Sequence, residues 1–227
     1  MKKLNITTLL CGLILFIAAC GPSSIKTEEG STTATSVDEG EVAIGKQIWT
    51  SKNLNVTTYR NGEVIPEVKD AKAWANLTTG AWCYYENKTV KGTTYGKLYN
   101  WYAVNDARGL APKGYHIPTD AEWTILTESL GDEAGTKMKS TSGWENNGNG
   151  NNTSGFAGLP GDCRYVNGNF DAIGGFTHYL GVSGCWWSSS EGSANGAWYR
   201  DLSSANALVY RGDGNKRAGF SVRCLRD

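Results

Sequence analysis

The chain has 227 residues, a formal net charge of zero at pH 7, nine Trp, eleven Tyr and 29 Gly. Without Lys2 and Lys3 the remaining part carries 20 basic and 22 acidic residues, a net charge of −2, which argues against a nucleic-acid partner. The abundance of aromatic residues and glycine favours a turn-rich protein that contains β-strands and a hydrophobic core.

The first 20 residues have the organisation of a bacterial lipoprotein leader. Two lysines precede an apolar run at 9–19 that is too short to span a membrane comfortably. The run ends in Ile17-Ala18-Ala19-Cys20, which resembles the lipobox, where the cysteine is lipidated after cleavage. We therefore expect a signal peptide at 1–19 and lipidation of Cys20, with a plain secretory signal as the alternative. Several acyl chains, palmitate among them, would anchor the chain stably in a membrane.

Residues 20–40 are predicted to form a flexible tether. This segment is rich in Ser, Thr, Gly and Glu and has almost no large apolar residues, so it cannot bury enough surface to become ordered. Its acidic pair Glu28-Glu29 resembles the surface-export signals of Bacteroidetes lipoproteins. The folded domain is expected to cover 41–227.

Extended segments and one short helix are predicted in the first part of this domain. Residues 41–59 alternate apolar and polar side chains and are rich in Ile, Val and Thr, which indicates one or two strands. Asp70 is a suitable N-cap for a short helix that ends near Asn76. The aromatic-rich segments 78–87 and 97–106 are predicted to be extended.

The clearest helix begins after Thr119. Thr119 and Glu122 have the spacing of a capping box, and Gly131 is a natural residue for the helix end. A second short helix is expected at 134–139. One apolar stripe should face the core from the first helix, formed by Trp123, Leu126 and Leu130.

Short strands are predicted after the Asn- and Gly-rich loop at 145–155. No helical pattern separates these strands, so they should pair in antiparallel fashion. In the last strand Phe220, Val222 and Cys224 would share one face, and the residues between them the other. The expected strands cover 163–166, 184–188, 196–202, 207–210 and 220–225.

Four cysteines lie in the predicted domain, and an even number in an exported chain suggests two disulfides. We favour Cys163–Cys185, which closes a short loop, and Cys83–Cys224, which ties an early segment to the last strand. Buried free thiols are the alternative. A zinc site is not expected, because no cysteines have the C-x-x-C spacing and the chain has only two His.

Six sequence blocks occur in order along the predicted domain. The blocks are YGKLYNWYAVND (95–106), GYHIPTDAEW (114–123), GFAGLPG (155–161), CWWSSSE (185–191), AWYRDL (197–202) and GFSVRCLRD (219–227). Together they resemble the Fibrobacter succinogenes major paralogous domain, which is found in lipoproteins of Bacteroidetes and their relatives. The resemblance extends over about 42–227 and implies an α+β domain of the C-type-lectin-like type seen in formylglycine-generating enzyme. In that fold two helices pack on twisted antiparallel strands, and the loops are long.

Two departures from the family pattern concern the cysteines. Members usually have aromatic residues at the positions of Cys163 and Cys185, and replacement of both supports their pairing. Members often have a cysteine where this chain has Leu110-Ala111, which leaves the partner of Cys224 open.

The resemblance does not extend to catalysis. Formylglycine-generating enzyme uses two cysteines close together near its C-terminus, and here Cys224 stands alone in that region. A pairing of His178 with Cys163 or Cys185, and a carboxylate pair from Asp162 and Asp171, are the remaining options, and we favour structural roles for both. Calcium-binding sugar loops with Glu-Pro-Asn or Gln-Pro-Asp are absent from the sequence. We therefore expect no catalytic residue, no metal and no cofactor.

The segment WWSSSEGSANGAWYRDL (186–202) combines Trp and Tyr with Ser, Asn and Gly, as recognition surfaces do. We expect Trp186 and Trp198 to be buried and the polar residues and tyrosines that follow to form a binding surface. Domains of this kind are also targets of diversity-generating retroelements, and the resemblance implies the same for this patch. The candidate ligand-binding residues are Trp187, Ser190, Asn195, Tyr199, Asp201, Ser203, Ser204, Asn206, Tyr210, Asp213 and Asn215.

The sequence therefore predicts a binding or adhesion module held in the bacterial cell envelope by a lipid anchor, with a glycan or protein as ligand. The expected location is the outer membrane, with exposure at the cell surface. Two alternatives remain open, a glycan-directed enzyme on the same fold and a structural subunit of a surface fibre.

Overall fold

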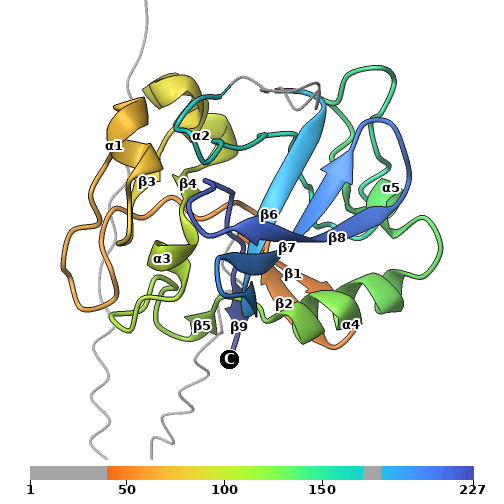
Figure 1. Cartoon of the computed structure of the whole chain (residues 1–227). Coiled ribbons are helices and arrows are strands. Elements are labelled where there is room, and N and C mark those ends of the chain that lie inside the picture. Colours follow the sequence, from red (N-terminus) through yellow and green to blue (C-terminus); the bar gives the residue numbers. More distant parts are fainter. Residues whose placement is uncertain (1–39, 171–179) are drawn as a thin grey trace, which may run out of the picture. The chain divides into compact units, whose positions relative to one another are not determined.

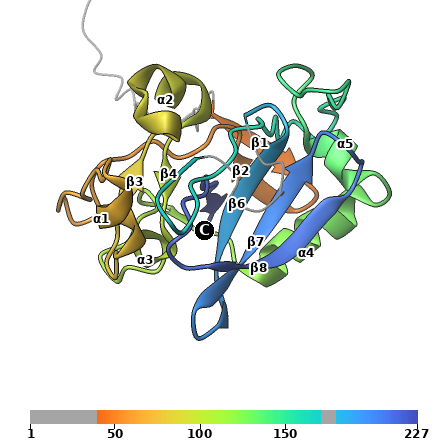
Figure 2. The same cartoon turned by 45° about the horizontal axis from the view of Figure 1, so that its top comes forward.

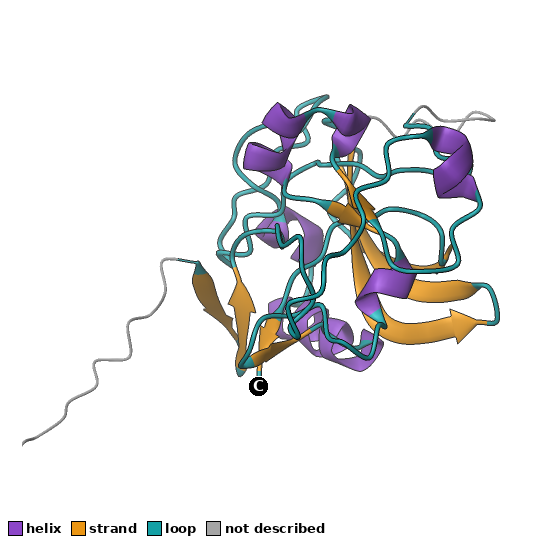
Figure 3. Cartoon of the chain, turned by 90° about the vertical axis from the view of Figure 1, so that its left-hand side faces the viewer, coloured by secondary structure: helices purple, strands orange, loops and turns teal. Residues whose placement is uncertain are grey.

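The computed structural model describes residues 40–170 and 180–227. The predicted leader (1–19), Cys20 and the tether up to residue 39 lie outside the described residues, as do Asp171 and His178. Figure 1 shows the elements in chain order, and Figure 3 shows the long loops that connect them. The elements are β1 (Glu41–Ile44), β2 (Gln47–Thr50), α1 (Ala71–Ala75), β3 (Trp82–Cys83), a 3-10 turn η1 (Tyr85–Asn87), α2 (Thr89–Tyr95), β4 (Leu98–Tyr99), α3 (Trp101–Val104), β5 (Tyr115–His116), α4 (Asp120–Leu130), α5 (Ala134–Met138), β6 (Ser183–Ser193), β7 (Gly196–Ser203), β8 (Val209–Asn215) and β9 (Leu225–Arg226).

The first sheet joins the two ends of the domain. Its strand order is β1-β2-β9-β5, and all its pairs are antiparallel. β1 and β2 form a hairpin around Gly45, whose φ of 60° lies in the left-handed region that glycine adopts without strain. Trp49 of β2 is opposite Leu225 of β9, so the last strand holds the first hairpin in place.

The second large sheet has the antiparallel strand order β6-β7-β8. Figure 2 shows its three strands side by side, and α4 packs against β6 and β7. Cys185 is opposite Asp201, and Trp187 is opposite Tyr199. The register shifts beyond Trp187, where β6 bulges before it reaches the turn into β7. A small third sheet pairs β3 with β4.

Hydrophobic cores lie on both sides of β6. Trp186 packs in a cluster with Trp123 of α4 and with Phe156, whose ring centroid is 5.6 Å from that of Trp186. Trp187 packs in a second cluster, where its ring centroid is 4.3 Å from that of Phe220. Because neighbouring residues of a strand point to opposite faces, the Trp-Trp pair supplies one indole to each core.

Helix α4 forms where the capping box predicts. The Thr119 hydroxyl accepts from the backbone N–H of Glu122, and the Glu122 carboxylate accepts from the backbone N–H of Thr119. Gly131 ends the helix with a φ of 64°. Trp123 and Leu126 are buried and Leu130 is half-buried, so the predicted stripe faces the core. The short helices after Asp70 and at 134–138 are confirmed as well.

The segment 220–225 differs from its prediction as a regular two-faced strand. Only Leu225 and Arg226 form a strand, and the preceding residues make single bridges to β4 and β6. All six side chains from Phe220 to Leu225 are buried, Arg223 included. The chain here runs between packed elements on both sides, so the alternation of apolar and polar residues does not separate core from solvent.

Two helices were not expected from the sequence. α3 lies within a segment predicted to be extended, and it begins because the Asn100 side chain accepts from the backbone N–H of Ala103. α2 contains Gly92, and glycine lowers helix propensity. The packing requires glycine at this position, because a Cβ there would collide with the Tyr84 ring. The α+β class is thus confirmed, with more helices than the two that the family resemblance implies.

Candidate ligand-binding surface

One face of β7 and β8 carries three of the residues predicted for recognition, Tyr199, Asp201 and Tyr210. Tyr199 and Asp201 point to the same side of β7, and across the strand pair they are opposite Gly212 and Tyr210. We call these four residues the tyrosine face. Tyr210 is 60% exposed and Tyr199 is half-buried, with ring centroids 6.3 Å apart. A Cβ at Gly212 would lie 2.6 Å from the Tyr199 ring and 2.8 Å from the Tyr210 ring, so the glycine makes room for both.

A small cavity of about 150 Å³ lies beside the tyrosine face. Tyr199 is part of the tyrosine face and also lines this cavity. Its ring centroid is 4.8 Å from that of Phe220, so Tyr199 is packed against the core. The cavity is lined mainly by apolar and aromatic groups, with the thiols of Cys163 and Cys185 among them. Other members of the lining are Arg164, Tyr165, Val166, Tyr199, Ala218 and Phe220.

The cysteines correct the disulfide prediction. Cys83, Cys163, Cys185 and Cys224 are all buried free thiols, so neither Cys163–Cys185 nor Cys83–Cys224 is bonded in the structure. Cys83 packs in the cluster around Trp74, whereas Cys224 belongs to the separate cluster around Trp187. Burial raises the thiol pKa of Cys83 and of Cys224 to about 12, and it raises those of Cys163 and Cys185 well above the ordinary value. Protonated thiols are poor nucleophiles, so these cysteines serve as small core residues.

Two carboxyl groups with raised pKa values lie close to the thiols. Burial raises the pKa of Asp201 to about 7, and the Cys185 thiol lies 3.7 Å from its Oδ1 atom. Burial also raises the pKa of Asp162 to about 7. Among the described residues, neither carboxyl oxygen of Asp162 has a hydrogen-bond partner. Both groups therefore change charge near neutral pH.

The opposite face of the same sheet carries an ion-pair network that sequence reasoning missed. Asp120 at the start of α4 accepts from Arg200 of β7 at 2.7 Å and from Arg211 of β8 at 2.8 Å. Arg211 also lies 3.4 Å from the centre of the Trp198 ring. Partial burial alone would raise the pKa of Asp120, but the bonds from the two arginines outweigh burial and lower it. Nothing in the sequence indicated this contact, because 80 or more positions separate the partners.

The remaining predicted residues separate into a core group and two ends of the sheet. Trp187 is completely buried and Ser204 is nearly so, which removes both from the surface.

Asn195 and Asn215 line a cavity of about 380 Å³ at the β6–β7 turn, together with Tyr102. Near that end, Asp213 is exposed, and Ser190 accepts from the backbone N–H of Asp120. Ser203 and Asn206 lie at the other end, where both backbone carbonyls accept from the buried Lys139.

Of the predicted buried tryptophans, Trp186 is buried and Trp198 is only half-buried beneath Arg211. His116 contacts Asp227 at 2.8 Å and Glu122 at 3.0 Å. It therefore links the C-terminal residue to the start of α4.

Neither a metal centre nor a spanning helix is present within 40–170 and 180–227. No group of three or more His, Cys, Asp or Glu side chains in these ranges is placed to hold a metal ion. In the same ranges no helix combines the length and apolar character needed to cross a membrane.

Comparison with known protein families gives a match over most of the chain. Residues 42–226 match the Fibrobacter succinogenes major domain. No curated protein and no solved structure matches the chain.

Proposed function

Because the chain belongs to the Fibrobacter succinogenes major domain family, we propose that it is a binding or adhesion module of the bacterial cell envelope. The family assignment is compatible with a cell-envelope role. The ligand in this proposal is a glycan or a protein, bound outside the cell by the C-terminal sheet.

The proposal includes attachment through lipid at Cys20. The lipobox-like sequence at 17–20 and the polar composition of 21–40 support it. In this arrangement residues 1–19 are removed, the outer membrane holds the acyl chains, and the tether carries the domain away from the bilayer. We also assign the domain to the C-type-lectin-like fold, which is supported by its antiparallel sheets, few helices and long loops.

The tyrosine face is the observation that carries the proposal. Tyrosine offers a large contact area that is both apolar and able to form hydrogen bonds, at a small cost in conformational entropy. Here the exposed Tyr210 stands on a paired strand and contacts Tyr199, which is fixed by Phe220. A rigid strand therefore holds the tyrosine face ready for a ligand.

A glycan and protein array with the full chain tests the tyrosine face. Tyr210→Ala should weaken binding of the identified ligand about tenfold or more, as loss of a central aromatic contact does. Ile125→Ala, which removes an exposed apolar side chain from α4, is the matched control and should bind as the wild type does. Equal binding by wild type and Tyr210→Ala would remove the tyrosine face from the proposal.

The proposal extends to diversification of the C-terminal sheet by a retroelement. A strand scaffold with fixed core residues, such as Trp187 and Phe220, supports variation at exposed positions. The neighbouring DNA would then contain a reverse-transcriptase gene and a near-repeat of the 3′ coding end. A genomic neighbourhood without them argues against this part of the proposal.

A catalytic role is the second candidate function, and one observation favours it. Asp162 and Asp201 have pKa values raised to about 7, which is typical of groups that exchange protons in active sites. Asp201 is half-buried on the tyrosine face. Hydrolysis of the identified glycan by the wild type, with its loss in Asp201→Asn, would replace the binding proposal with the enzymatic one.

A further inference from the structure

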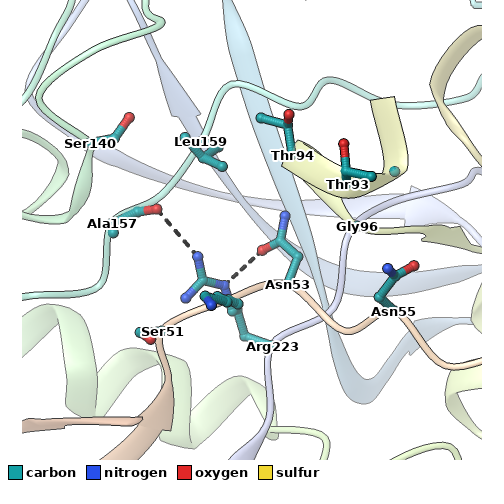
Figure 4. Close-up of a pocket in the computed structure, with 12 residues that line it drawn as sticks. Ser51, Asn53, Asn55, Thr93, Thr94, Gly96, Ser140, Ala157, Leu159 and Arg223 are labelled. Atoms are coloured by element: carbon teal, nitrogen blue, oxygen red, sulfur yellow. Dashed lines mark hydrogen bonds between the residues drawn. The ribbon is translucent and has the colours of Figure 1, made fainter. Parts of the chain in front are cut away.

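A cavity of about 480 Å³ lies away from the tyrosine face, between α2, the segment after β2 and the segment before β9. Figure 4 shows Arg223 and Ser51 on one side and Thr93 and Thr94 of α2 across from them. The volume is within the range of small-molecule sites, roughly 300–1,000 Å³. No Asp or Glu contributes to its lining, whereas Lys52 and Arg223 do.

Arg223 lies at the floor of this cavity and is 1% exposed. Its guanidinium donates to three neutral oxygens, Thr50 O at 2.7 Å, Asn53 Oδ1 at 2.7 Å and Ala157 O at 3.3 Å. A guanidinium has five N–H groups, so these bonds leave donors unused. No carboxylate of the described residues forms an ion pair with Arg223. Burial lowers its pKa to about 9, which still leaves it charged at neutral pH.

The position of Arg223 is fixed by Asn53. The Asn53 Oδ1 atom accepts from Arg223 and also from the Trp186 indole at 2.8 Å, and its amide donates to Tyr95 O at 2.8 Å. A Cβ at Gly96 would lie 2.9 Å from the Asn53 side chain. The packing therefore holds the charge where it is, and it cannot turn to meet a distant acid.

A second buried cation lies behind Asn55. Lys97 is buried, and its ammonium donates to Asn55 Oδ1 at 2.5 Å and to Asn55 O at 2.9 Å. It also lies over the rings of Trp82 and Tyr84, at 4.6 and 4.9 Å from their centres. Because Lys97 binds its oxygen, the Asn55 amide still has both N–H donors to offer into the cavity.

The rim adds one more charge and several hydroxyl groups. Lys52 is exposed at the opening, and Thr93 donates its hydroxyl proton to Val90 O, which leaves the oxygen to accept. Leu159 and Ala157 supply apolar surface. The cavity thus combines positive potential, N–H donors, hydroxyl oxygens and an apolar wall. A buried charge acts more strongly than an exposed one, because little water screens it.

We propose that this cavity binds an acidic sugar, a polyhydroxylated ring that carries one carboxylate or sulfate group. The oxyanion would lie between Lys52 and the charge of Arg223, and the ring hydroxyls would meet Asn55 and the α2 threonines. This site is separate from the tyrosine face.

Calorimetric titration of the full chain tests the ligand class. The probes are glucuronate, glucose 6-sulfate, neutral glucose and inorganic sulfate. At least one of the two acidic sugars should bind, about tenfold or more tightly than glucose, a ratio that corresponds to about 1.4 kcal/mol. The comparison between glucuronate and glucose 6-sulfate tells which oxyanion the site prefers. Binding of inorganic sulfate alone, or equal binding of glucose and both acidic sugars, would overturn the proposal.

Paired variants test the location. Lys52→Glu reverses the charge at the rim and should weaken binding of the preferred acidic sugar about tenfold. Lys46→Glu makes the same charge change at another exposed lysine and should leave binding within about twofold. An equal effect of the two substitutions would overturn the assignment to this cavity.

Arg223→Met tests the floor of the cavity, once circular dichroism shows that the variant is folded. A folded variant should lose binding of the acidic sugar, and retained binding would contradict the proposal. If the variant does not fold, Lys52→Glu still decides, because it changes an exposed side chain. Tyr210→Ala should bind the acidic sugar as the wild type does, so failure of this proposal is distinguishable from failure of the tyrosine face.

Discussion

Arg200 and Arg223 are both buried, but only Arg200 has a carboxylate partner among the described residues. On the α4 side of the C-terminal sheet, Arg200 pairs with Asp120 at 2.7 Å, and Arg211 approaches the same carboxylate from outside. At the floor of the large cavity, Arg223 has only neutral acceptors. A charge that is neutralised within the chain stabilises the fold, whereas one left without an acid can attract an anion from solution.

The largest expected effect is in the paired region. Asp120→Asn would leave Arg200 buried without a counter-ion, and we expect it to reduce the free energy of unfolding by about 3–5 kcal/mol. Urea unfolding followed by Trp fluorescence measures this loss. Asp132→Asn removes an exposed carboxylate just after α4 and should change stability by less than about 0.5 kcal/mol. A similarly small effect of Asp120→Asn would show that the pair is not important for the fold.

Asp162 is the acidic counterpart of Arg223, a buried group without a partner among the described residues. Its pKa is raised from 3.8 to about 7, so the folded state holds a proton that the unfolded state releases. The contribution of Asp162 to stability should therefore fall as pH rises from about 4 to 7, by about 4 kcal/mol for a shift of roughly three units, and change little above. Asp201, whose pKa is also raised to about 7, adds a separate fall in the same range.

Asp162→Asn tests whether this pH dependence of stability comes from the buried carboxyl group. It removes the buried charge at pH 8 but keeps a buried polar group, so a gain of about 2 kcal/mol is expected at that pH. Urea unfolding at pH 4.5 and pH 8 measures the change. A variant that keeps the full pH dependence of the wild type would contradict the assignment of that dependence to Asp162.

The smallest effect is expected at His116, which is partly exposed between two carboxylates. Partial burial alone would lower its pKa, but contacts with Asp227 and Glu122 outweigh burial and raise it. Its contribution should be complete below the unfolded pKa of about 6.5 and should be lost as pH rises through the raised folded value. Solvent screening limits the loss to less than about 1 kcal/mol. His116→Gln should remove this step from thermal unfolding curves measured between pH 6 and 8.5.

Local sequence rules predicted the elements that depend on local contacts. Thr119, Glu122 and Gly131 define α4 because cap bonds join residues only a few positions apart. The antiparallel pairing of β6, β7 and β8 followed from the absence of helices between them. Tyr210 was correctly placed at the surface for the same kind of reason, since alternation on a strand with one open face separates core from solvent.

The same alternation rule failed where both faces are covered. Trp187 was expected among the ligand contacts, but β6 has a core on each side, so both of its tryptophans are buried. Arg223 was expected on the strand face opposite Phe220, Val222 and Cys224, yet packing surrounds the whole segment. The contacts that decide these positions join residues far apart in the chain, such as Arg223 with Asn53 at a separation of 170 positions. No local pattern contains that information.

The adjacent indoles of β6 have a consequence for how the domain comes apart. Trp186 and Trp187 insert into different hydrophobic cores. If β6 separates from one of these cores, its displacement also exposes the other core to water. Partial melting of either half is therefore disfavoured, and the two halves should lose structure together in one cooperative transition.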